Sequence, residues 1–286
     1  MNIKKRIILS VFAALFLLTL ILFLIFFILP RIATGDAALP VLMYHHIDEK
    51  STESTVVTPA RFEEHIRTLR DAGYNSVTVQ QVINFVGGAG ELPEKPVLIT
   101  FDDGYTSNLD IAAPILEKYG MCATVFVIGV NEGKEIYIHS GNPLYPPRFS
   151  YEDAAPWVEK GVIDVQSHSF DMHQLESYGF SGRDGMRRLK DESDEAYAAA
   201  VKADCLAFAE SRGDKISTEL TALSYPFGYY TKELDSILSE CGIQMTFTIK
   251  ERINSLKIGD PSCLRMMGRF NITERLSGKM LLLWIK

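Results

Sequence analysis

Short apolar segments alternate with amphipathic helical segments along most of this chain, and this alternation constrains the fold more than any other feature. Residues 58–72 illustrate the helical pattern, because Thr58 is a good N-cap and Phe62, Ile66 and Leu69 follow at helical spacing. The predicted strands cover residues 40–44, 74–79, 96–101, 123–128, 162–165, 222–225 and 244–248. The other predicted helices cover residues 80–85, 108–119, 151–160, 191–212 and 232–239. Alternation of this kind predicts a parallel sheet with right-handed crossovers. About seven strands in roughly 250 residues favour a closed barrel over a small open sheet.

The N-terminus has a different character. Lys4, Lys5 and Arg6 precede an uncharged apolar run over residues 7–29, which is long enough to cross a hydrocarbon core of about 30 Å as a helix. A cleavable signal has a shorter apolar core of about 7–15 residues, so we expect an uncleaved anchor. Cleavage within residues 32–37 remains the alternative. A buried soluble helix would show a polar face, which this run lacks.

The basic residues before the apolar run place the N-terminus inside the cell and the following chain outside. We therefore expect a cytoplasmic stub and transmembrane anchor over residues 1–30, a linker over 31–39 and one catalytic domain over 40–286. The protein would be a single-pass protein of the bacterial cell membrane. The net charge of −7 argues against a nucleic-acid partner. None of the four cysteines forms a C-x-x-C pair, so a cysteine metal site is not expected, while one disulfide remains an open alternative.

Two acids follow the strand predicted over residues 96–101. Asp102 and Asp103 lie at its end and precede Gly104, in the position where the active sites of α/β barrels are built. Asp-Gly alone is typical of a turn, but a turn does not need the second acid, and two like charges at the end of a buried strand are costly. A bound cation would relieve their repulsion. Because adjacent side chains diverge, one acid could bind a metal while the other faces a reacting water.

Histidines follow two further predicted strands. His168 and His173 are separated by five residues, which places them about 140° apart on an α-helix and on opposite faces of a strand. Only a bent loop would bring both imidazoles to one point. His45 and His46 follow the first predicted strand. Unrelated surface histidines and polar residues leaving the core remain the alternative interpretations.

Two histidines and one carboxylate form the three-ligand set with an open position that a catalytic metal requires. A bound divalent ion lowers the pKa of its water toward about 7. A nearby carboxylate can take a proton from that water, and a separate histidine can protonate a leaving amine. These are the parts needed for metal-assisted amide hydrolysis.

Three segments carry a family resemblance: Thr-Phe-Asp-Asp-Gly-Tyr at 100–105, the histidines of 168–173, and Tyr-Pro-Phe-Gly at 225–228. In this order they resemble the motifs of the polysaccharide deacetylase family (NodB-homology domain, carbohydrate esterase family 4). The strand Val41–Tyr44 with His45 is similar to the opening strand of that family, and the resemblance covers roughly residues 40–250.

The resemblance implies a distorted (β/α)7 barrel and one divalent metal ion, often zinc, with other transition metals as alternatives. Carried over by position, Asp103, His168 and His173 would be the metal ligands. Asp102 would be the catalytic base.

Two departures from the common family pattern matter. Many members place the second histidine four residues after the first, where this chain has Met172; the five-residue spacing resembles the poly-N-acetylglucosamine deacetylases of biofilm export systems. No histidine follows His173 to serve as the general acid near the C-terminus. In the biofilm branch a histidine of the opening strand has that role, and His45 matches it better than His46. The arginine that braces the base in many members has only Arg269 as a candidate.

The expected function is metal-dependent hydrolysis of N-acetyl groups on an extracellular amino-sugar polymer. Peptidoglycan, poly-N-acetylglucosamine and chitin-type oligomers all fit as the N-acetylated cell-surface glycan. An O-acetyl or acetylxylan esterase of the same family is the alternative enzyme, because the chemistry is shared. A catalytically silent carbohydrate-binding protein of the envelope is the alternative without activity, and the loss of any one ligand would have favoured it.

Overall fold

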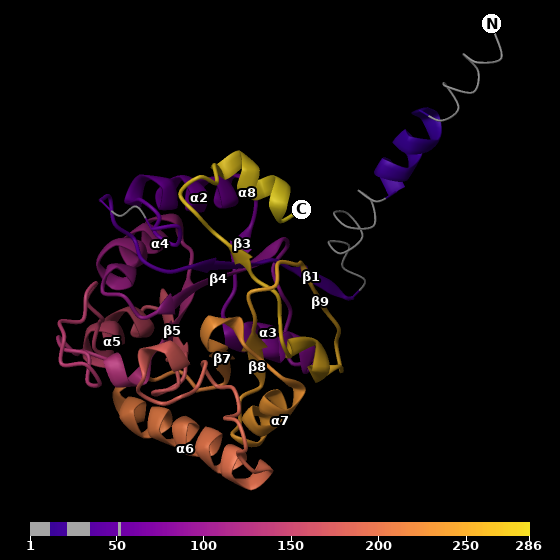
Figure 1. Ribbon diagram of the computed structural model, residues 1–286. Helices are drawn as coiled ribbons and strands as arrows, with labels where there is room; N and C mark the ends of the chain where they lie inside the picture. Colours follow the sequence, from indigo (N-terminus) through magenta and orange to yellow (C-terminus); the bar gives the residue numbers. More distant parts are fainter. Residues whose placement is uncertain (1–11, 22–34, 51–52) are drawn as a thin grey trace, which may run out of the picture.

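The computed structural model describes residues 12–21, 35–50 and 53–286 (Figure 1). A curled parallel sheet forms the centre of the molecule. In spatial order its strands are β10 (Phe270–Asn271), β2 (Val41–Tyr44), β4 (Pro96–Asp103), β5 (Ala123–Val127), β6 (Ile163–Ser167), β7 (Ala222–Ser224) and β8 (Met245–Phe247), and β3 (Asn75–Ser76) pairs with β4. Neighbouring strands are parallel throughout this order.

The two ends of the strand order approach each other through the segment that leads into β10. Met267 forms a parallel bridge with Phe247 of β8, and its N–H donates to the carbonyl of Thr246 over 2.8 Å. Shortly afterwards, β10 pairs with β2. The sheet therefore curls round on itself and gathers the carboxyl ends of its strands. The expected distorted barrel is present as this curled parallel α/β sheet.

Helices surround the sheet, as Figure 1 shows. Their first turns follow from local sequence: the hydroxyl of Thr58 accepts the N–H of Arg61, and Thr78 forms a capping box with Gln81. The helices are α2 (Pro59–Asp71), α3 (Val79–Val86), α4 (Ala113–Tyr119), α5 (Tyr151–Glu159), α6 (Asp194–Arg212), α7 (Lys232–Glu240) and α8 (Gly278–Trp284).

Alternate side chains of the central strands face two different apolar clusters. On one face, Ile99 and Val125 pack with Phe62 of α2 and with residues of α4 and α5. On the other face, Leu98 and Phe126 pack with residues of α3. Because both faces are covered, the strands are continuous apolar runs, as in other buried parallel sheets.

Some elements differ from the sequence-based expectation. The chain also forms β1 (Ala37–Leu39), which pairs antiparallel with β9 (Asn254–Leu256), so the stretch expected as a linker contributes a strand. The strand predicted over 74–79 is only two residues long, because Thr78 caps α3. The helix predicted over 108–119 opens with a π-helical turn, Asn108–Ala112, before α4. All four cysteines are free, so the disulfide is not formed.

The predicted membrane anchor lies mostly outside the described residues. Of its span, 7–29, the structure describes only residues 12–21, which are helical. In the described part of the chain, no helix has both the length and the apolar character needed to span a membrane. The anchor therefore stays a prediction.

Candidate active site

The end of β4 brings two neighbouring carboxylates to one side. On a straight strand Asp102 and Asp103 would point to opposite faces. Asp103 instead has a φ of +73° and Gly104 a φ of +70°, a left-handed conformation that costs a non-glycine residue about 1–3 kcal/mol. A Cβ on Gly104 would also lie 3.2 Å from Val127. Through this turn both carboxylates lie near Nε2 of His168, at 3.9 Å for Asp102 and 3.6 Å for Asp103.

The three predicted metal ligands converge on one point. Nε2 of His168 and Nε2 of His173 each lie 3.6 Å from the same carboxylate oxygen of Asp103. The two imidazole rings are 4.7 Å apart between centroids. The second Asp103 oxygen accepts the hydroxyl of Tyr105 over 3.0 Å. The bent loop that the five-residue spacing required is therefore present.

Neighbouring groups fix the orientation of His168. Its Nδ1 lies 2.8 Å from the carbonyl oxygen of Ser224, at the end of β7. A carbonyl only accepts hydrogen bonds, so Nδ1 carries a hydrogen, and in the neutral imidazole Nε2 is the nitrogen with the lone pair, on the side of Asp103. Outer partners of this kind hold metal-binding histidines in place.

His173 is held by packing. Its ring lies 4.3 Å from the ring of Phe227, a residue of the 225–228 segment whose φ is +56°. Burial, reinforced by the nearby His168, lowers the pKa of His173 to about 4. The imidazole is therefore neutral at physiological pH and has a lone pair available.

This donor set fits a divalent metal ion. Ligand atoms of Asp103, His168 and His173 all lie within 4.8 Å of one another. One carboxylate oxygen and two imidazole nitrogens are ordinary ligands of zinc and of other transition-metal ions. Three protein ligands leave further positions open for water and substrate.

Arg269 binds Asp102 in a bidentate ion pair. Its two terminal nitrogens donate to the two oxygens of Asp102, each over 2.7 Å. Arg269 is fully buried and also donates to the carbonyl of Thr248 and the hydroxyl of Ser224. Burial alone would raise the pKa of Asp102, but the charge of Arg269, aided by His168, holds that pKa well below its ordinary value. Asp102 is therefore ionised and oriented, and Arg269 has the contacts expected of the bracing arginine.

His45 lies close enough to both acids to favour their charged forms. Burial alone would raise the pKa of Asp103. The nearby His173 and His45 outweigh this effect, so the pKa of Asp103 lies below its ordinary value. His45 also contributes to the lowered pKa of Asp102. Its Nδ1 is buried and has no hydrogen-bond partner among the described residues.

His46 is engaged elsewhere. Its Nδ1 lies 2.8 Å from the hydroxyl of Ser107, and its Nε2 lies 3.6 Å from Asp48. Its ring packs 4.9 Å from that of Tyr105. Burial lowers the pKa of His46, although Asp48 opposes the shift. These contacts distinguish His46 from the neighbouring His45.

Sequence reasoning missed several supporting residues. Ser224, which contacts both His168 and Arg269, directly precedes the 225–228 segment, so its place beside a motif was the available signal. Phe227 lay within the motif, but its packing against His173 is a tertiary contact. The role of Thr248 had no local signal, because its backbone carbonyl makes the contact.

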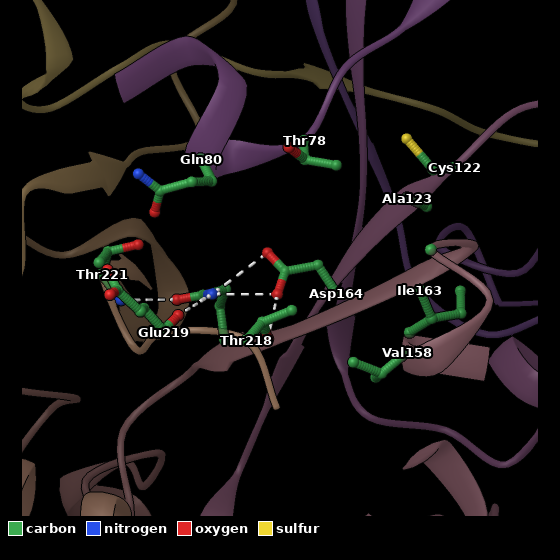
Figure 2. A pocket seen from close by; sticks show the side chains of 12 residues that line it. Thr78, Gln80, Cys122, Ala123, Val158, Ile163, Asp164, Thr218, Glu219 and Thr221 are labelled. Atoms are coloured by element: carbon green, nitrogen blue, oxygen red, sulfur yellow. Dashed lines mark hydrogen bonds between the residues drawn. The ribbon is translucent and has the colours of Figure 1, made fainter. Parts of the chain in front are cut away.

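A separate cavity of about 450 Å³ lies at the opposite edge of the sheet (Figure 2). Ala123 and Ile163, which begin β5 and β6, line it together with Asp164 and Cys122. The carboxylate of Asp164 accepts the hydroxyl of Thr218 over 2.8 Å, as Figure 2 shows. The Asp–His–His cluster lies where β4 and β6 end, at the carboxyl edge of the sheet, so this cavity is not part of the candidate site.

The fold and the site together define a class of protein. The molecule is a curled parallel α/β protein with a carboxylate–histidine cluster, suited to a divalent metal, where its strands end. A second, ionised acid lies beside that cluster in a bidentate pair with a buried arginine.

Comparison with known proteins gives the family. The family model for polysaccharide deacetylase matches residues 89–246, and the chain belongs to the polysaccharide deacetylase family. A Bacillus subtilis protein provisionally named polysaccharide deacetylase YxkH is 31% identical over 212 residues, covering 74% of this chain and 64% of the relative. A poly-β-1,6-N-acetyl-D-glucosamine N-deacetylase of Staphylococcus epidermidis is 26% identical over 203 residues, covering 71% of this chain and 64% of the relative. The chain thus spans 64% of the length of each of these curated relatives.

Solved structures share the fold. The IcaB structure from Ammonifex degensii matches with a TM-score of 0.69 and 25% identity, covering 88% of this chain and 98% of that one. A de-N-acetylase from Aggregatibacter actinomycetemcomitans matches with a TM-score of 0.73 and 21% identity, covering 87% of this chain and all of that one.

Proposed function

We propose that this protein is a metal-dependent deacetylase that removes N-acetyl groups from an extracellular amino-sugar polymer. The observation that carries the proposal is the convergence of Asp103, His168 and His173 beside the ion pair of Asp102 with Arg269. In this proposal the first three residues bind one divalent ion, with zinc as the first candidate. Asp102 is the catalytic base.

The metal would supply Lewis-acid polarisation of the acetyl carbonyl and would acidify a water molecule at neutral pH. Asp102 takes the proton of the attacking water, because it is ionised and its orientation is fixed by Arg269. The backbone N–H of Tyr105 donates to the oxyanion that develops on the carbonyl. These roles describe amide hydrolysis that yields acetate and a free amine.

His45 completes the reaction as the general acid. The amine nitrogen needs a proton as the bond to the acetyl carbon breaks. The support for His45 is its electrostatic influence on both acids and its buried Nδ1, which has no hydrogen-bond partner among the described residues. His46 is less suitable, since Ser107 and Asp48 already occupy its two nitrogens.

Relatives support the substrate class. The Staphylococcus epidermidis relative is named for removing acetyl groups from poly-β-1,6-N-acetyl-D-glucosamine. The five-residue histidine spacing of this chain resembles the pattern of that branch of the family. A cavity of about 240 Å³ adjoins the site through Tyr105 and His46 and is also lined by the exposed Tyr145. An aromatic ring of this kind suits the apolar face of a sugar. Poly-N-acetylglucosamine is therefore the first glycan to test, ahead of peptidoglycan and chitin-type oligomers.

The proposed location is the outer face of the cell membrane. The support is the sequence alone: basic residues before an uncharged apolar run of anchor length over residues 7–29. A domain that follows this anchor would meet cell-surface glycans directly.

Acetate release from a substrate panel tests the function. The full-length protein with zinc should release acetate from β-1,6-linked N-acetylglucosamine oligomers, and each acetate should be matched by one new primary amine. Acetylxylan, which carries only O-acetyl groups, serves as the comparison. Faster release from acetylxylan than from all N-acetylated glycans would favour the esterase alternative, and no release from any substrate would favour a silent binding protein.

A further inference from the structure

The loop that joins His168 to His173 is bent without regular secondary structure, and side chains bind its backbone. Each N–H group of residues 169–172 donates to a side-chain oxygen, over 2.8–3.1 Å. Two carbonyls of the loop accept N–H groups from residues 129 and 130. Irregular buried backbone needs such partners, because an unpaired N–H group there would cost about 1–3 kcal/mol.

Only one of these acceptor side chains comes from a distant element. Ser167 and Ser169 act locally, whereas Asp204 lies on α6. One oxygen of Asp204 accepts the N–H of Phe170 and the other accepts the N–H of Asp171, each over 2.8 Å. Asp204 thereby ties the middle of the loop to a long helix.

Asp204 is buried, with 8% of its surface exposed. Burial raises its pKa to about 6, even though the backbone N–H groups of Asp171 and Phe170 favour its charged form. A buried carboxylate whose described hydrogen-bond donors are backbone N–H groups is costly. Among the described residues, its hydrogen bonds are with the loop between the two histidines, and we therefore look for its role in that loop.

The bend is what the metal site requires. Five residues of regular helix or strand would point the two imidazoles in different directions. Here Ser169 adopts a φ of +70°, and the chain returns so that His173 lies 4.7 Å from His168, ring to ring. The two N–H groups bound by Asp204 lie inside this bend.

We propose that Asp204 is a positioning residue that forms the bend between His168 and His173 before the metal binds. Its carboxylate holds two consecutive backbone N–H groups, so that both imidazoles already face Asp103. The inference rests on the metal site of the proposed function and adds to it a residue that touches neither metal nor substrate.

Asp204→Asn is the informative variant, because it keeps the size of the side chain. Asparagine has one acceptor oxygen, and its NH₂ group would face one of the two backbone N–H groups. One hydrogen bond is therefore lost. Loss of such outer contacts typically weakens metal affinity by about 10–100-fold.

Asp164→Asn is the matched control. Asp164 is also a buried carboxylate, 7% exposed, and its oxygens accept the hydroxyl of Thr218 and the amide of Gln166. It lines the cavity at the far edge of the sheet (Figure 2). This variant changes a buried acid without touching the loop.

The affinity of the full-length protein for zinc, measured by competition with a chromophoric chelator, is the first test. Asp204→Asn should bind zinc about 10–100-fold more weakly than wild type, while Asp164→Asn stays within about twofold. Thermal unfolding of the metal-free proteins should show both variants folded. If Asp204→Asn binds as tightly as Asp164→Asn, the positioning role is wrong. If wild type binds no more tightly than His173→Ala, the metal site itself is wrong.

Hydrogen exchange of the metal-free wild-type protein is the second test and needs no variant. The amides of Phe170 and Asp171 should be protected before any metal is added, since Asp204 already binds them. Free exchange of both amides until zinc is added would show that the metal orders the loop, and would overturn the proposal even if Asp204→Asn failed to fold.

Discussion

Replacing Arg269 with methionine should destabilise the metal-free protein by about 3–5 kcal/mol at neutral pH, the usual cost of leaving a buried charge without its partner. Arg269 is fully buried, Asp102 is 3% exposed, and two hydrogen bonds of 2.7 Å join them. Methionine fills a similar volume but leaves Asp102 without a bound cation. The hydrogen bonds to the carbonyl of Thr248 and the hydroxyl of Ser224 are lost as well.

Urea unfolding of the single and double variants separates the cost of the unpaired Asp102 charge from the cost of the other lost contacts. Asp102→Asn combined with Arg269→Met removes both charges, so the double variant should be more stable than Arg269→Met alone by about 2 kcal/mol or more. Arg188→Met is the control, because Arg188 pairs with Asp194 and Glu233, whose side chains are 83% and 46% exposed; it should cost less than about 1 kcal/mol. The reasoning is refuted if Arg269→Met costs no more than this control, or if the double variant is no more stable than Arg269→Met.

Four further outcomes are expected. His173→Ala should abolish stoichiometric zinc binding, while Met172→Ala should keep it. The reverse result would show that His173, five residues after His168, is not the second histidine ligand. His45→Ala should keep its fold and metal but lose turnover by about 10²–10⁴-fold, with His46→Ala the milder change; full turnover in His45→Ala would exclude it as the acid. Burial raises the pKa of Asp164, so the folded protein binds the proton of this carboxyl more tightly than the unfolded chain does. The free energy of unfolding should therefore fall as the pH rises from the ordinary pKa of the carboxyl through its raised pKa. Urea unfolding at several pH values should show this fall in wild type and a smaller one in Asp164→Asn. Protease added to intact cells, or to spheroplasts, should digest the domain; protection until lysis would contradict the outward topology.

Much of the fold could be predicted from the sequence, because its strands are covered on both faces. Strand β4 is a continuous apolar run for this reason. Helices α2 and α3 begin at N-cap residues that can be recognised in the sequence, Thr58 and Thr78. By contrast, β9 and β10 are two or three residues long, and segments this short carry no periodic pattern. Their pairing depends on where the rest of the sheet has placed them.

The candidate site, too, could be predicted from the sequence only in part. Asp102, Asp103 and His168 could be predicted, since the two acids end the buried strand β4 and His168 directly follows the buried strand β6. The pairing of Asp102 with Arg269 joins residues 167 positions apart, and only the curl of the sheet brings them together. Asp204 looked like any polar residue of a long helix, because its role depends on a loop that α6 reaches through tertiary packing.

The most direct test of the account measures metal content and acetate release on the same samples of full-length protein. Wild type stripped by a chelator should release no acetate from N-acetylglucosamine oligomers and should recover when about one equivalent of zinc is added. Asp102→Asn should take up the same one equivalent and still release no acetate, because only the base is missing. Acetate release by the stripped wild type, or turnover at the wild-type rate by zinc-loaded Asp102→Asn, would contradict metal-dependent deacetylation with Asp102 as the base.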